Sequence, residues 1–194
     1  ELTPSSNHGV TTAVMGNCGV GFAPCRPEDK EKLISLMEGV EDIPHPVLSE
    51  GLPWNWETFP EYLDSLSARQ YDIDFAAQIP HGPLRVYVMG KRGANRETAT
   101  QQDIERMASL TTESIKAGAL GFSTSRTLNH QTADGQPTPT LTAELSEMVG
   151  IAKGVKAAGH GVMQVVTDFK GDDNEFEILK EMARQSGRPL SVSV

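Results

Sequence analysis

The sequence predicts an α/β fold built on a parallel sheet, and two observations support this prediction. Short apolar runs with the character of strands alternate with longer amphipathic stretches along the chain. The last three helical stretches each end at a glycine, and a strand-like run follows shortly after it. Because strands separated by helices cannot pair as hairpins, the strands should be parallel and joined by right-handed crossovers. The fold is therefore either an open, doubly wound sheet or part of a (β/α)8 barrel.

The first half of the chain contains two strands and two helices in this interpretation. A strand covers Thr11 to Met15 and stops in a glycine-rich turn. A helix begins at about Pro27, because proline in the first turn with acidic residues beside it is typical of a helix start. A second helix covers Thr58 to Arg69, has its apolar residues on one face, and leads to the strand Ile73 to Ile79.

The second half contains three helix–strand pairs. They are the helix Thr100 to Ala117 with the strand Ala119 to Ser123, the helix Leu141 to Ala158 with the strand Val162 to Thr167, and the helix Asp172 to Gln185 with the strand Leu190 to Val194. Five strands are visible where a closed barrel needs eight, and the last is apolar with nothing after it to cover it. We therefore expect residues 1–194 to form a single domain that is a piece of a longer enzyme, with a compact five-stranded domain as the alternative.

Composition narrows the classes of function. A chain of 194 residues with 38% hydrophobic content can bury one core. Its formal charge of -9 offers no basic surface for nucleic acid or anionic lipid. No apolar run approaches the roughly 18 residues of a membrane span, and two cysteines are too few for a disulfide framework. These features predict a cytoplasmic protein that binds neither nucleic acid nor membrane.

The chemistry of a parallel α/β protein lies at the carboxyl ends of its strands. The residues at these ends are Asn17, Cys18, Gln78, His81, the run Ser123 to Arg126, Thr167, Asp168 and Ser193. Cys18 stands out because the flanking Gly16 and Gly19 allow a tight turn that leaves the thiol open to a cavity. The thiolate could bind zinc or attack a carbonyl carbon, and the alternative is a buried cysteine acting as a small apolar residue. A nucleotide site is disfavoured, because the glycines lack the G-x-G-x-x-G spacing.

Several strings of the sequence resemble one enzyme family. They are GVTTAVMGNCGVGFAP (residues 9–24), EGVEDIP (38–44), WNWETFPEYLDSL (54–66), HGPLRVYVMG (81–90) and GALGFSTSRT (118–127). In this order they resemble the D-aminoacylase branch of the amidohydrolase superfamily, the N-acyl-D-amino-acid deacylases. The resemblance implies a partial (β/α)8 TIM barrel, about strands 2 to 6, and zinc-dependent hydrolysis of the acyl amide of an N-acyl-D-amino acid. It also implies that Cys18 matches the family's metal-ligand cysteine at the end of the second barrel strand.

The sequence departs from the family pattern at other metal positions. The family's His-x-His pair would lie upstream of Glu1, and its proton-shuttling aspartate beyond Val194. The family's fifth and sixth strands carry histidine ligands, whereas the matching runs VMQVVTD (162–168) and LSVSV (190–194) contain none. We therefore expect either a differently built metal site, with Asp168 as a candidate ligand, or a parent enzyme that is not a conventional zinc deacylase.

Three residues are candidates for substrate binding. Arg126 could hold the substrate carboxylate by a two-pronged contact, and Ser123 could donate a hydrogen bond in the site. His81 follows a strand and would face the mouth of the barrel, although capping or packing is an alternative role. His130 lies in a loop and is interpreted as incidental.

Two open sheet edges are expected from an arc of five strands. Such edges pair readily with another copy, so we expect the isolated chain to form a homo-oligomer and to lack catalytic activity. A non-catalytic structural or binding domain that self-associates is the alternative to the enzyme.

Overall fold

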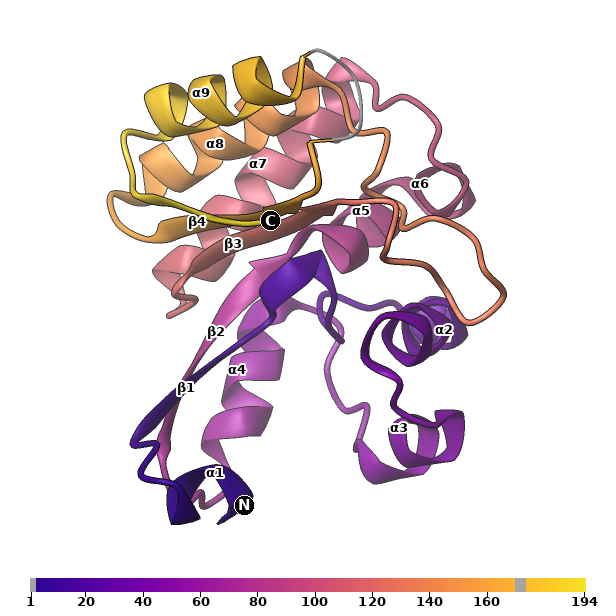
Figure 1. Ribbon diagram of the computed structural model, residues 1–194, viewed down its shortest axis with the longest axis vertical. Helices are drawn as coiled ribbons and strands as arrows, with labels where there is room; N and C mark the ends of the chain where they lie inside the picture. The colour runs from indigo at the N-terminus through magenta and orange to yellow at the C-terminus, as the bar shows by residue number, and fades with distance from the viewer. Residues whose placement is uncertain (1–2, 170–173) are drawn as a thin grey trace.

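The computed structural model describes residues 3–169 and 174–194, which form a five-stranded parallel sheet with helices packed against it (Figure 1). The strands are β1 (Thr12–Met15), β2 (Asp74–Pro80), β3 (Gly121–Arg126), β4 (Val162–Thr167) and β5 (Leu190–Ser193). They lie side by side in chain order, and every neighbouring pair is parallel. The sheet curls into a half-barrel, so the predicted partial (β/α)8 barrel is confirmed.

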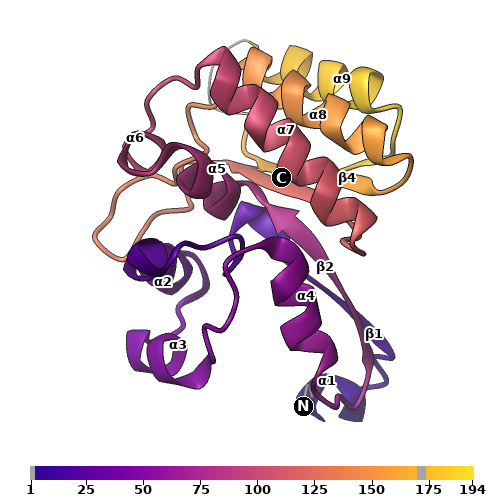
Figure 2. The ribbon, with the colours of Figure 1, turned by 180° about the vertical axis from the view of Figure 1, so that it is seen from behind.

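The helices follow the strands in the order that crossovers require. They are α1 (Thr3–Asn7), α2 (Lys30–Glu41), α3 (His45–Gly51), α4 (Phe59–Ser67), α5 (His81–Met89), α6 (Lys91–Ala94), α7 (Gln101–Lys116), α8 (Leu145–Ala158) and α9 (Glu175–Ser186), with short 3-10 turns at Asn17–Gly19 and Pro27–Asp29. Both α4 and α7 begin with a capping box, formed by Thr58 with Glu61 and by Thr100 with Asp103. Figure 2 shows α7, α8 and α9 side by side over one face of the sheet. No helix within 3–169 and 174–194 is long and apolar enough to cross a membrane.

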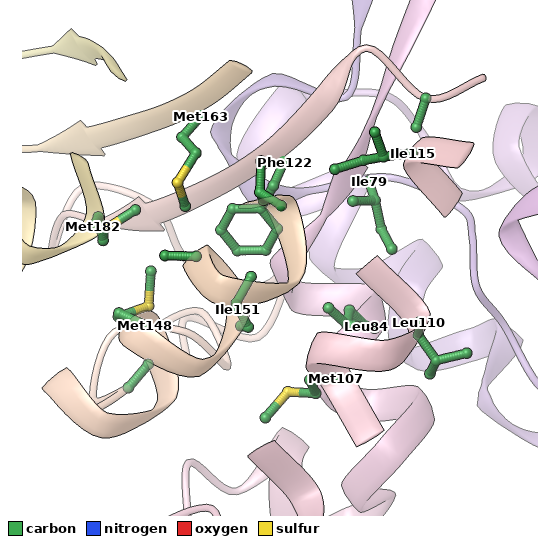
Figure 3. Packing of buried hydrophobic residues seen from close by; sticks show 14 of the residues in the cluster. Ile79, Leu84, Met107, Leu110, Ile115, Phe122, Met148, Ile151, Met163 and Met182 are labelled. Carbon is green, nitrogen blue, oxygen red and sulfur yellow. The ribbon is translucent and has the colours of Figure 1, made fainter. Parts of the chain in front are cut away.

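The core lies between the sheet and these helices (Figure 3). Ile79 of β2, Phe122 of β3 and Met163 of β4 are each fully buried there. They pack with helix residues such as Met107 and Ile151. Because side chains alternate along a strand, the neighbours of these strand residues face the inside of the half-barrel. One face of each strand therefore holds the core, and the other lines the interior.

The helix α5 is absent from the sequence prediction. It begins at His81, directly after β2, and most of its residues are buried, so it carries no polar stripe that would mark its period. Helix α3, which begins at His45, is also absent from the sequence prediction.

Two predicted elements are shifted. Strand β3 runs from Gly121 to Arg126 instead of from Ala119 to Ser123, and α8 begins at Leu145 instead of Leu141. Residues 141–142 form a turn and residues 143–144 are irregular, although their apolar members extend the helical pattern. The helix predicted from Asp172 begins in a part of the chain outside the described residues, and α9 is described from Glu175.

Candidate active site

The turn after β1 has an unusual backbone. Gly16 has φ of 83°, Gly19 has φ of 67°, and Cys18 itself has φ of 59°, in the left-handed region that a residue with a Cβ rarely adopts. An added Cβ on Gly19 would lie 2.7 Å from the Cα of Thr124, so only glycine fits between the turn and β3. The turn is therefore pressed against the carboxyl end of the neighbouring strands, as the sequence predicts for the Cys18 position.

Cys18 is half-buried at this edge of the sheet. Burial raises the pKa of its thiol, and the negative charge of Glu41 adds to the effect. In the described part of the chain, no positive group counteracts this shift, so at neutral pH the thiol is mainly protonated. The other cysteine, Cys25, is buried, and burial raises its pKa to about 12.

Three inward-facing side chains from successive strands make hydrogen bonds to the turn. Gln78 of β2 donates from Nε2 to Oδ1 of Asn17 at 2.9 Å. Ser123 of β3 accepts at Oγ from the Gly19 amide at 3.2 Å and donates to the Gly16 carbonyl. Gln164 of β4 accepts at Oε1 from the amide of Cys18 at 3.2 Å. The interior near Cys18 is thus lined by neutral amide and hydroxyl groups.

Arg126 and Asp168 lie at the same edge of the sheet but in a different environment. Arg126 donates from Nε to the carboxylate of Glu175 at 2.8 Å and from Nη1 to the carbonyl of Ala143 at 2.7 Å. Asp168 accepts at Oδ2 from the hydroxyl of Thr127 at 3.1 Å, and it makes further interactions. Both residues line a cavity of about 720 Å³ near the starts of α8 and α9, and its lining includes none of Cys18, Ser123 and His81.

His81 is fully buried between β3 and α8. Its Nε2 lies 2.9 Å from Oε1 of Glu147, and its Nδ1 lies 2.8 Å from Oγ1 of Thr124. Arg85 donates from Nε to the same carboxylate oxygen at 2.9 Å. Burial lowers the pKa of His81, which fits a neutral ring that donates to Glu147 and accepts from Thr124.

The carboxylate at the centre of this group stays ionised. Burial alone would raise the pKa of Glu147, but the hydrogen bond from His81 and the charge of Arg85 outweigh it and hold the pKa below its usual range. The group therefore ties α5 and α8 to the sheet, and the structure places His81 within it rather than at the open mouth.

His130, for which the sequence predicts no role in the site, lies beside the end of β3. Its Nδ1 lies 2.9 Å from Oγ of Ser125, an inward-facing residue near the end of β3, and the ring is half-buried. Burial lowers its pKa, and Glu41, which also acts on Cys18, shifts it in the opposite direction. No motif in the sequence marks this histidine, because a loop residue is placed by the packing of the loop against the sheet.

A metal centre requires several ligands in one place. Among residues 3–169 and 174–194, no group of three or more histidine, cysteine, aspartate or glutamate side chains could hold a metal ion. The side chain of Gln78 ends beside Asn17, and its Oε1 is enclosed and accepts no hydrogen bond within the described residues. This part of the chain offers one thiol donor at Cys18 and does not by itself fit a metal.

Comparisons with known proteins cover the whole chain. A family model described as "Amidohydrolase family" matches residues 1–193. The D-aminoacylase of Alcaligenes xylosoxydans xylosoxydans is 28% identical over 194 residues, which are 100% of this chain and 35% of that protein. The N-acyl-D-aspartate deacylase of the same organism is 31% identical over 126 residues, or 64% of this chain and 22% of that protein.

The fold has solved counterparts as well. A structure of D-aminoacylase, described in terms of its binuclear metal centre, superposes with a TM-score of 0.67 at 27% identity, covering 97% of this chain and 35% of that chain. The chain thus spans about a third of the length of the relatives that match it throughout.

Proposed function

The chain belongs to the amidohydrolase family, and from this membership we infer that the whole protein hydrolyses the acyl amide bond of an N-acyl-D-amino acid. The observation that supports the proposal most is the match to D-aminoacylase over all 194 residues. In addition, Cys18 lies directly after β1, at the carboxyl end of the strands, where barrel enzymes have their active sites. The similarity to an N-acyl-D-aspartate deacylase makes an acidic side chain one candidate for the substrate.

We propose zinc as the metal of the whole protein, with Cys18 as one of its ligands. Zinc prefers sulfur and imidazole donors, and Cys18 lies where a strand ends in a tight turn. The described residues offer no group of three such ligands. We propose that the remaining ligands come from parts of the whole protein that correspond to the regions of the relatives outside the matched third. Asp168 remains a weaker candidate, because its carboxylate already accepts from Thr127 and the amide of Leu128.

Arg126 remains the proposed contact for the substrate carboxylate, because it lines the 720 Å³ cavity at the strand ends. A substrate carboxylate bound there would replace Glu175 as the acceptor of the Arg126 Nε hydrogen bond. Cavities of this size hold small molecules in other proteins. The polar atoms of Ser123 and His81 already have internal partners, so we propose that Ser123 supports the Cys18 turn and that His81 supports the packing of α8.

The test is release of free amine from N-acetyl-D-amino acids by the whole protein, with and without added zinc. N-acetyl-D-aspartate, N-acetyl-D-glutamate and N-acetyl-D-leucine report on the side chain, and the L enantiomers serve as controls. We expect activity on at least one D substrate and a large excess over its L enantiomer. Absence of amine from every substrate at any zinc concentration would overturn the proposal.

The ligand role of Cys18 has its own test. Elemental analysis should find less zinc in the Cys18→Ala variant of the whole protein than in the wild type, with Cys25→Ala as the matched control. Equal zinc in all three proteins would refute the assignment.

A further inference from the structure

The backbone of the Cys18 turn needs support from outside the turn. Left-handed φ angles at Gly16, Cys18 and Gly19 make three of its four residues unusual, and the cysteine has no glycine-like freedom. Such a conformation persists where the surrounding structure fixes it. The direction of the Cys18 thiol therefore depends on whatever holds the turn.

The support comes from one row of side chains across the sheet. Ser123 is the register partner of Gln164 in the β3–β4 pair, and Pro80 is the partner of Ser123 in the β2–β3 pair. Gln78 lies two residues before Pro80 and so faces the same way. The exposed fractions of Gln78, Ser123 and Gln164 are 4%, 0% and 6%, which removes the competition of water for their hydrogen bonds.

These contacts act on the backbone of the turn. Gln164 accepts from the amide of Cys18 itself, and Ser123 bridges the Gly16 carbonyl and the Gly19 amide on either side of it. The two side chains therefore hold backbone groups on both sides of Cys18 as well as its own amide. The side chains of outward-facing neighbours such as Phe122 and Met163 pack in the core instead.

We propose that Gln164 and Ser123 are positioning residues, which fix the Cys18 turn so that the thiol faces the mouth of the barrel. The importance of this positioning for function rests on the proposed role of Cys18 as a ligand. The conformation of the turn can be tested without measuring catalysis. Gln164 acts through the backbone amide of Cys18, so a side chain that keeps an acceptor oxygen should preserve the turn and one that lacks it should release the turn.

The experiment measures the rate at which iodoacetamide labels Cys18 in the 194-residue chain, resolved by peptide mass spectrometry. Cys25 provides an internal reference, because it is buried in a separate part of the fold. We expect Gln164→Met to label Cys18 at least about threefold faster than the wild type, with an unchanged Cys25 rate. Gln164→Glu, which keeps the acceptor, should label no faster than the wild type.

The matched control is Gln185→Met on α9, which makes the same exchange and loses a hydrogen bond to Glu181 far from the turn. It should leave the Cys18 rate unchanged. Should Gln164→Met fail to fold by circular dichroism, Ser123→Ala replaces it with the same expected increase. Equal Cys18 rates in wild type and the acceptor-free variants, or Gln164→Glu labelling as fast as Gln164→Met, would overturn the proposal. Because no substrate or metal enters this assay, failure of the deacylase proposal would leave its outcome unaffected.

Discussion

Replacing Glu147 by glutamine should destabilise the chain strongly, although the two side chains have nearly the same size and shape. The carboxylate has an exposed fraction of 1% and faces Arg85, whose exposed fraction is 0%. With glutamine the shape is kept, but the guanidinium loses its counter-charge in the interior. Removing one partner of a buried ion pair costs roughly 3–5 kcal/mol. The carbonyl oxygens of Gly93 and Pro139 also accept from Arg85 and soften the loss, so we expect the lower end, about 3 kcal/mol.

The assay is thermal and urea unfolding of the chain, followed by far-ultraviolet circular dichroism. For a domain of this size each kcal/mol lowers Tm by roughly 2–4 °C, so the Glu147→Gln variant should melt roughly 6–12 °C below the wild type. The matched control is Glu105→Gln on the exposed face of α7, where the change should stay within about 0.5 kcal/mol.

A double variant separates charge from packing. Arg85→Met combined with Glu147→Leu removes both charges, and it should be less destabilised than Glu147→Gln because no buried charge is left alone. A Glu147→Gln variant within about 1 kcal/mol of the wild type would refute the interpretation of this group as a buried charge pair.

Three further predictions concern pH, packing and assembly. Because the pKa of His81 is lowered in the folded state, the stabilisation by its neutral form is complete above the unfolded pKa of about 6.5 and is lost as the pH falls. His81→Gln removes this titration, so the urea midpoint of the variant should decline less between pH 7 and pH 5 than that of the wild type. Gly121→Ala should prevent folding, since its Cβ would lie 1.9 Å from the carbonyl oxygen of Val162, whereas Gly51→Ala has open space and should fold normally by circular dichroism. The open edges of β1 and β5 should make the isolated chain self-associate at tens of micromolar, and light scattering that gives a stable monomer would contradict this.

The arrangement of strands was predictable because its signals are local. Each strand is a short apolar run, and glycines such as Gly118 and Gly159 separate it from the preceding helix. Helix α5 left no such signal, because burial of most of its surface removes the polar stripe on which the prediction depends.

The candidate site was predictable in part. The turn at Cys18 could be predicted because the glycines that allow it, Gly16 and Gly19, lie next to it in the sequence. The positions of His81 and His130 depend on contacts with residues far away in the chain, namely Glu147 for the first and the end of β3 for the second. Both are histidines near a strand end, but His81 is fully buried in α5, whereas His130 is a half-buried loop residue beside Ser125.

The two-sided strands have a consequence for how this sequence can change. Ile79, Phe122 and Met163 pack in the core, while the side chains of their neighbours Gln78, Ser123 and Gln164 form hydrogen bonds with the Cys18 turn. A substitution in the first set therefore weakens the core, whereas one in the second set alters the turn at the strand ends. The polar interior of the half-barrel can thus be changed one residue at a time while the apolar layer between sheet and helices keeps the fold.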